Sequence, residues 1–232
     1  MRARSLLVVG LVALLAGALA VPALAHDEGM GLAPTVVAYK ASSAPVIDGK
    51  LDDAAWLDAA LAGAKVSGFV THVGDAIATD QTIAYITWDD ENLYVAFKNY
   101  RTDMNQLVAN MTEPMSSVFL EDDNEVFIDP FHDHATFIQF AWNAIATKWS
   151  GIGDVESWQV ATSKDDTAWY AEVAIPWTLV GVTPAEGLTI GFNVTSHVIW
   201  NDQWTTWSPT FGTFLNPRRF GHLQLAGQYV RP

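Results

Sequence analysis

The chain has 232 residues, with 12 basic and 26 acidic side chains, a net charge of −14 and no cysteine. Such an acidic surface without a basic stripe repels phosphate backbones, which excludes nucleic acid as a partner. The lack of cysteine excludes a disulfide-held fold, so hydrophobic packing has to stabilise the protein.

The first 25 residues have the pattern of a secretory signal peptide. Arg2 and Arg4 precede an apolar run over residues 6–19, and Ala-Leu-Ala at residues 23–25 supplies the small residues of a cleavage site. The run is too short to span a membrane, and no second run of spanning length follows. We therefore expect a secreted or periplasmic protein, whose charge becomes −16 because −14 loses two arginines and no acid.

Residues 26–35 are typical of a flexible leader, residues 36–226 of one β-rich domain and residues 227–232 of a C-terminal tail. Alternating apolar and polar residues predict one hairpin from residues 82–88 and 92–98 and a second from residues 158–162 and 168–175. Further strands are expected at residues 36–39, 125–129, 136–143, 188–196 and 220–225. Regular strands with almost no helix predict an antiparallel β-sandwich of the jelly-roll type.

The strand over residues 125–129 carries the most informative pattern. Val126 and Ile128 point to one face, while Glu125, Phe127 and Asp129 point to the other. Acidic groups beside a phenyl ring indicate either a binding site or a solvent-exposed face with one exposed ring.

A set of short motifs follows the chain in a fixed order. They are Val-Ile-Asp-Gly at 46–49, Asp-Asp-Ala-Ala-Trp at 52–56, Trp-Asp-Asp-Glu-Asn-Leu-Tyr-Val at 88–95, Asp-Asn-Glu-Val-Phe-Ile-Asp-Pro at 123–130, Ala-Ile-Pro-Trp at 174–177, Gly-Phe-Asn at 191–193 and Pro-Arg-Arg-Phe-Gly at 217–221. This order resembles the family 9 carbohydrate-binding modules and their DOMON-like relatives, from about residue 36 to residue 225. The resemblance implies a β-sandwich that binds sugars without cleaving them, often beside a glycoside hydrolase domain and often with structural calcium.

The resemblance also implies a sugar site. Two tryptophans clamp a terminal sugar in that family, and by motif position they fall on Phe119 and Phe214. The family's acidic ligand falls on Glu125. Its basic ligand has no counterpart, and Gln139 and Asn143 are the nearby polar candidates.

The chemistry of sugars supports the same choice independently of the resemblance. Their apolar faces need flat aromatic rings, and their hydroxyl rims need carboxylate, amide or guanidinium groups. Asn216 and Arg218 extend the candidate set on this ground. Trp204, in a stretch rich in Trp and Thr, either lies at the rim of the site or packs in the core.

Two cofactors have candidate ligands. Asp89, Asp90, Asp122 and Asp123 could bind Ca²⁺ through oxygen, but their spacing is not that of an EF-hand, which favours solvated turns. The alternative function is a haem b-binding, DOMON-like electron-transfer module. Its candidate axial ligands are Met104, Met111 and Met115 with His72, His197 or His222 opposite.

Two histidine patterns favour a structural reading. His132-Asp133-His134 could hold a transition metal, but the preceding Asp-Pro and the lack of a third obvious ligand favour a surface turn. His26 would be the first residue after cleavage and could bind copper, although a disordered leader is the simpler reading.

No catalytic constellation stands out. Glu125 and Asp129 lie on one strand, about 13 Å apart, which is too far for either mechanism of glycoside hydrolysis. With the resemblance, the sequence therefore predicts an exported, non-catalytic carbohydrate-binding module, which acts alone or as an accessory to polysaccharide degradation by a glycoside hydrolase.

Overall fold

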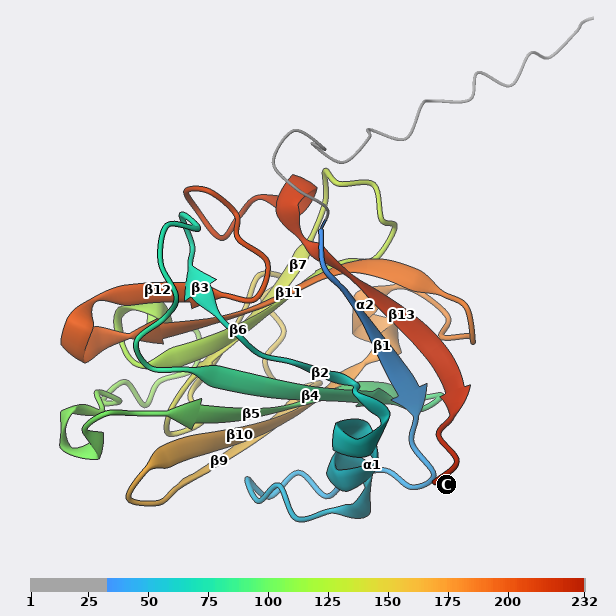
Figure 1. Cartoon of the computed structure of the whole chain (residues 1–232), viewed down its shortest axis with the longest axis horizontal. Coiled ribbons are helices and arrows are strands. Elements are labelled where there is room, and N and C mark those ends of the chain that lie inside the picture. The colour runs from blue at the N-terminus through green and yellow to red at the C-terminus, as the bar shows by residue number, and fades with distance from the viewer. Residues whose placement is uncertain (1–32, 232) are drawn as a thin grey trace, which may run out of the picture.

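The computed structural model describes residues 33–231, which form a β-sandwich built from one continuous sheet. The segments expected to form the signal peptide and most of the leader lie outside these residues. Along the sheet the strands follow the order β8 (Lys148–Ser150), β7 (Ile138–Asn143), β6 (Asp123–Asp129), β11 (Thr189–Val198), β13 (Gly221–Gln228), β1 (Thr35–Lys40), β4 (Thr82–Trp88), β5 (Asn92–Tyr100), β10 (Ala168–Pro176) and β9 (Gln159–Lys164). Figure 1 shows the sheet folding over so that two layers face each other, with β1 and β13 at the side that joins them.

Three short strands extend the sheet at its sides. They are β2 (Lys65–Val66) beside β4, β12 (Gln203–Thr206) beside β11, and β3 (Val70–Thr71) beside β12. The sequence analysis missed all three, and also β8, because two to four residues are too few to establish an alternating pattern. Two of them, β8 and β12, carry residues of the candidate site described below.

The predicted strands and both hairpins are confirmed. β4 pairs with β5, and β10 with β9, in antiparallel register, and β10 joins the two hairpins by pairing with β5. The sheet departs from the expected fully antiparallel pattern at one strand, because β1 runs parallel to both β13 and β4. No tight turn connects β1 to either neighbour, so hairpin geometry does not dictate its direction.

Helix α1 (Ala54–Ala62) contains Trp56 and the alanines around it. Its sequence is rich in alanine, the best helix former, and it ends at Gly63 in the left-handed conformation with φ of 74°. Trp56 is 2% exposed and packs on the outer side of β5 and β10. The second helix, α2 (Trp177–Val180), is a single turn that directly follows Pro176. No helix within residues 33–231 is long and apolar enough to cross a membrane.

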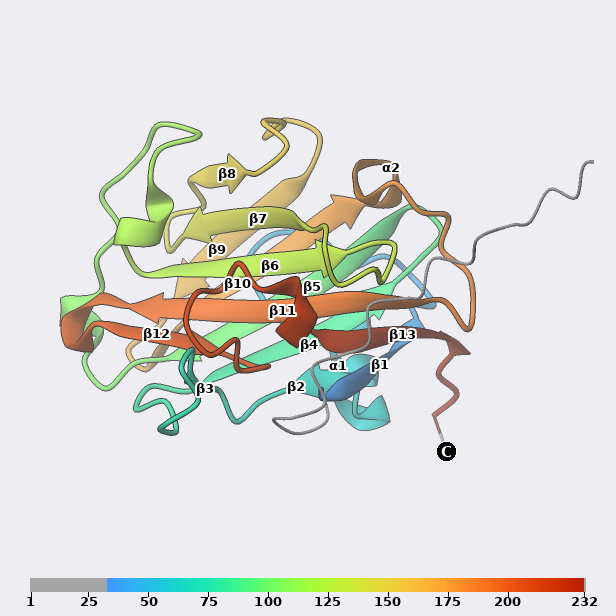
Figure 2. The same ribbon diagram turned by 90° about the horizontal axis from the view of Figure 1, so that it is seen from above.

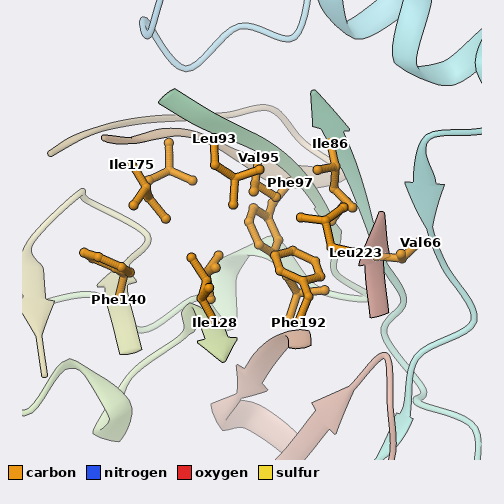
Figure 3. Close-up of a cluster of buried hydrophobic side chains, with 14 of the residues drawn as sticks. Val66, Ile86, Leu93, Val95, Phe97, Ile128, Phe140, Ile175, Phe192 and Leu223 are labelled. Carbon is orange, nitrogen blue, oxygen red and sulfur yellow. The ribbon is translucent and has the colours of Figure 1, made fainter. Parts of the chain in front are cut away.

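The main core lies between the two layers. Figure 3 shows Leu93, Val95 and Phe97 of β5 pointing toward Ile128 of β6 and Phe192 of β11. These side chains fill the inner faces of both layers. The candidate site described below lies on the outer face of the layer that contains β7, β6, β11 and β12. Figure 2 looks onto this layer and shows the red segment between β12 and β13 lying over β11.

Candidate functional site

A pocket of about 540 Å³ opens on the outer face of the β6 layer. Its lining comes from β6, β7, β8 and β12 and from three loop segments. The lining residues are His72, Phe119, Glu125, Gln139, Trp149, Trp204, Gly212, Thr213, Phe214 and Leu215. Segments far apart in the sequence therefore meet around one central strand.

Strand β6 positions the acid of the pocket through its alternation. Val126 and Ile128 enter the main core, and Glu125 and Phe127 point outward, as predicted. The alternative of a solvent-exposed face is wrong, because every residue of β6 is buried. Phe214 and Phe220 cover Phe127, with ring centroids 6.2 and 5.6 Å away. This cover leaves Glu125 at the base of the pocket.

Glu125 is 2% exposed and is held by two neighbours. Its carboxylate accepts a short hydrogen bond from the Gln139 amide and a longer one, 3.4 Å, from the Thr195 hydroxyl. Burial raises the pKa of Glu125 to about 7, although both hydrogen bonds act in the opposite direction. Asp123, on the same face of β6, also has a pKa raised well above its ordinary value, first by burial and then by the charge of Glu125.

Aromatic rings flank Glu125 on both sides. In the strand order β8-β7-β6-β11 with β12 beyond, Trp149 of β8 and Trp204 of β12 lie on opposite sides of β6. Phe119 packs edge-on against Trp149 with centroids 4.9 Å apart, and Phe214 lies 5.7 Å from Trp204. Phe119, Trp149 and Trp204 are partly exposed, whereas Phe214 is only 7% exposed. The first three rings can therefore offer a face to a ligand, and Phe214 supports them from below.

Five of the eight predicted sugar-site residues meet in this pocket: Phe119, Glu125, Gln139, Trp204 and Phe214. Trp204 lines this pocket and is partly exposed, and it also packs against the cluster of Phe127, Phe214 and Phe220.

Asn143, Asn216 and Arg218 do not line the pocket. Asn143 shares a face of β7 with Gln139, but a loop covers it, and its amide donates to the carbonyl of Met111 and to Glu121, at 2.9 Å each. The Asn216 amide donates to the carbonyl of Thr210 at 3.1 Å. Arg218 is exposed in the turn Pro217–Arg219.

The sequence analysis missed Trp149, and it named His72 as a candidate haem ligand but not as a residue of this pocket. Trp149 is the middle residue of the three-residue strand β8, and His72 directly follows the two-residue strand β3. Neither strand is long enough to show a period. The Trp149 side chain beside Lys148 and Ser150 was the single available signal, an aromatic residue in a short polar stretch.

The four candidate calcium ligands have roles within the fold. Asp89 caps its turn by accepting from the backbone of Glu91 and Asn92, and Asp90 forms an ion pair with Lys40 at 2.6 Å. Within residues 33–231, no group of three or more His, Asp or Glu side chains is arranged to hold a metal ion.

The other two acids lie at the start of β6. Asp122 forms a buried ion pair with Arg101 at 3.0 Å and accepts from the backbone of Val108. Asp123 accepts from the backbone of His197 at 3.1 Å. Both acids therefore fasten neighbouring segments to the sheet.

The histidine turn has an unexpected neighbour. His132 and His134 both adopt left-handed backbone conformations, with φ of 51° and 56°, in the turn after β6. His222 of β13 completes a group of three rings, since its Nδ1 lies 2.8 Å from Nε2 of His132. The turn itself is confirmed. His26 lies outside the described residues.

The candidate haem ligands lie in separate surroundings. Met104 packs against the main core, Met111 gives its carbonyl to Asn143, and Met115 is partly exposed in a turn. His72 lines the pocket, and His197 is buried behind Trp204.

Solved structures with a similar fold share this architecture. A family 9 carbohydrate-binding module from Caldicellulosiruptor kristjanssonii, in complexes with cellotriose and with glucose, gives TM-scores of 0.64 and 0.65 at 20% and 21% identity. These matches cover 85% and 84% of this chain and 98% of the other. A putative carbohydrate-binding protein from Bacteroides uniformis gives 0.66 at 13% identity, over 84% of this chain and all of the other. At these identities the likeness establishes the fold.

Two curated enzymes contain a related segment. Endo-1,4-beta-xylanase A of Thermoanaerobacterium saccharolyticum is 29% identical over 202 residues, and exoglucanase XynX of Acetivibrio thermocellus is 29% identical over 216 residues. The matches cover 79% and 84% of this chain, but 16% and 18% of the enzymes. The chain thus spans less than a fifth of the length of these relatives.

The family-level match covers nearly the whole sandwich. The model of the family described as carbohydrate family 9 binding domain-like matches residues 47–228, from the turn before α1 to the end of β13. This match supports the carbohydrate reading of the sequence and not the haem alternative. The chain belongs to the carbohydrate family 9 binding domain-like family.

Proposed function

We propose that this protein is a non-catalytic module that takes the end of a short oligosaccharide into the pocket around Glu125. The observation that carries the proposal is the arrangement of partly exposed rings, Trp149 and Trp204, on opposite sides of the buried Glu125 and the half-buried Gln139 bonded to it. Sugars present flat C–H faces and a hydroxyl rim, and this arrangement offers a partner for each. A pocket of about 540 Å³ has the size of an ordinary small-ligand site.

Different side chains of the pocket bind different parts of the sugar. Phe119 and Trp204 stack on the sugar faces, and Glu125 accepts hydrogen bonds from neighbouring hydroxyls while Gln139 donates to and orients the carboxylate. The bond from Gln139 fixes one carboxylate oxygen before a ligand arrives. This pre-ordering lowers the entropy cost of binding.

The related proteins suggest the substrate class and the setting. The solved relatives hold cellotriose and glucose, and the curated relatives are named as a xylanase and an exoglucanase. We therefore assign β-linked plant polysaccharide fragments as the ligand class. The module acts outside the cytoplasm and beside a polysaccharide-degrading enzyme, either on the same chain or as a separate partner.

Isothermal titration calorimetry with glucose, cellobiose, cellotriose and xylobiose tests the proposal, with and without calcium. Phe119→Ala and Trp204→Ala should each weaken binding about five- to thirtyfold, because each removes a stacking face worth about 1–2 kcal/mol. Leu120→Ala is the matched control, since Leu120 is adjacent to Phe119 and 64% exposed but does not line the pocket. If Phe119→Ala and Trp204→Ala bind saccharide as tightly as the Leu120→Ala control, the site lies elsewhere. If the folded wild type binds none of these saccharides, the proposed function is refuted.

A further inference from the structure

His197 lies behind the pocket, where it contacts both aromatic sides of it. It belongs to β11, directly opposite Trp204 on β12 and Asp123 on β6, so the three side chains share the outer face of the sheet. The residue is 3% exposed and does not line the pocket. It therefore cannot serve as a ligand contact in the way that Glu125 does.

One contact of His197 holds Trp204. The imidazole and indole rings are stacked, with centroids 3.7 Å apart and planes 19° from parallel. This contact covers one face of the indole and restricts its rotation. The indole ring, which is partly exposed, keeps its other surface available to the pocket.

A second contact holds Phe119. Nδ1 of His197 lies 2.9 Å from the backbone carbonyl of Phe119. Phe119 is the middle residue of the short helical turn Val118–Leu120. A carbonyl oxygen only accepts, so Nδ1 carries the hydrogen and donates it. The hydrogen bond fixes the turn that presents the phenyl ring. The backbone N–H of His197 also donates to Asp123, at 3.1 Å, which anchors the residue to β6.

We propose that His197 is a positioning residue, which sets the separation of the two aromatic sides of the pocket by holding Trp204 through its ring and Phe119 through its Nδ1. Because one rigid side chain makes both contacts, the rings are placed before a ligand enters. Pre-placed rings lose less conformational entropy on binding and so bind more tightly. The inference rests on the proposed function for its effect on sugar affinity, but the effect on Trp204 can be measured without any sugar.

Two substitutions separate the two contacts. His197→Asn keeps a side-chain N–H that can donate to the Phe119 carbonyl and loses the stacked ring. His197→Phe keeps a ring against Trp204 and loses the donor. Val173→Ala is the control for loss of stability alone, because Val173 is fully buried on β10 in the opposite layer.

The direct measurement is ¹⁹F NMR of protein labelled with 5-fluorotryptophan. The Trp204 resonance is assigned as the one that disappears in Trp204→Phe. We expect His197→Asn to shift or broaden this resonance and His197→Phe to change it less. We expect both to weaken binding of cellotriose about tenfold, whereas Val173→Ala changes neither.

The outcomes distinguish this inference from the proposed function. The inference is overturned if both His197 variants leave the Trp204 resonance and the affinity for cellotriose unaltered. It is also overturned if Val173→Ala, destabilised to the same extent as the His197 variants, loses as much affinity as they do. If the wild type binds no saccharide but the Trp204 resonance responds to His197→Asn, the positioning role stands and the sugar function fails.

Discussion

Asn99 on β5 and Asn124 on β6 exchange two hydrogen bonds, 2.8 and 2.9 Å long, across the interior of the sandwich. Both side chains are fully buried. Thr82 donates a further bond to Asn99, and Asn124 donates one to the carbonyl of Thr195. The pair is therefore a satisfied polar link between two otherwise apolar layers, and it fixes how β5 and β6 lie over each other.

Removing either member of this pair should destabilise the protein. Asn99→Ala or Asn124→Ala leaves the other amide buried without its partner, so we expect each to lower the free energy of unfolding by about 2–3 kcal/mol. The double variant should lose less than the sum of the two, because its second substitution removes the orphaned group. Urea denaturation measures all three, with Gln224→Ala as an exposed control; strict additivity contradicts the prediction.

Trp56 should depend on Glu172 for its position. The indole donates to Glu172 at 2.6 Å, and the same carboxylate accepts from the backbone of Asp48 and Gly49. Glu172→Gln replaces one accepting oxygen by a donor, so one of the three N–H groups loses its partner. We expect a loss of about 2 kcal/mol in unfolding free energy. Thermal unfolding should show it, and Glu186→Gln, at an exposed position, should have no effect.

The stability of the protein should fall as the pH rises toward 8. Glu125 has a folded-state pKa of about 7, against 4.5 when unfolded, so between these values the folded state binds more protons than the unfolded state. Its contribution to stability is thus present below pH 4.5 and lost as the pH rises through 7, an effect of about 3 kcal/mol. Glu125→Gln should flatten the dependence of urea denaturation on pH between 5 and 8. An unchanged slope in this variant would show that Glu125 ionises normally.

Sugar affinity should change with pH in the opposite direction. Ligand hydroxyls donate best to an ionised carboxylate, and Glu125 passes from mostly protonated to mostly ionised between pH 6 and 8. We expect the affinity for cellotriose to rise about tenfold over this range. Calorimetry in buffers of different ionisation enthalpy should also detect proton release on binding at pH 6. Equal affinity at the two pH values would mean that Glu125 does not contact the ligand in its charged form.

Phe119 and Phe214 should respond differently to truncation. Phe119 is partly exposed, so Phe119→Ala should lower affinity and change the unfolding free energy by less than about 1 kcal/mol. Phe214 is 7% exposed and packs on Phe127, so Phe214→Ala should cost about 3 kcal/mol. Calorimetry and urea denaturation of both variants separate the two effects. A large stability loss in Phe119→Ala alone would reverse the assignment.

The parts of the fold that the sequence predicted are those with long, regular alternation. The strands over residues 82–88 and 92–98 show their period over seven residues each, and both were found. Strand β12 was missed because four residues, two of them threonine, give no clear period. β12 forms by pairing with β11, and a local sequence pattern cannot reveal which strands pair.

The site was predicted in part for a similar reason. Glu125 follows from the alternation of its own strand, so its direction was correct. Phe214 was expected as a stacking ring; it lines the pocket, but its burial against Phe127 and Phe220 was not foreseen. Trp149 was missed because it joins the site through a three-residue edge strand. Which aromatic side chain reaches a pocket depends on what covers it, and covering segments lie far away in the sequence.

The alternation along β6 has a further consequence for how such a protein can diversify. Inward residues such as Val126 keep the layers together, while the outward Glu125 meets the pocket and is bonded by Gln139 of the neighbouring strand. Under the proposed function, substitution at positions 125 and 139 would change the groups offered to a ligand without altering the inner face. The strand works as a fixed scaffold on one side and an adjustable recognition surface on the other, which makes this pair the natural starting point for a randomised library.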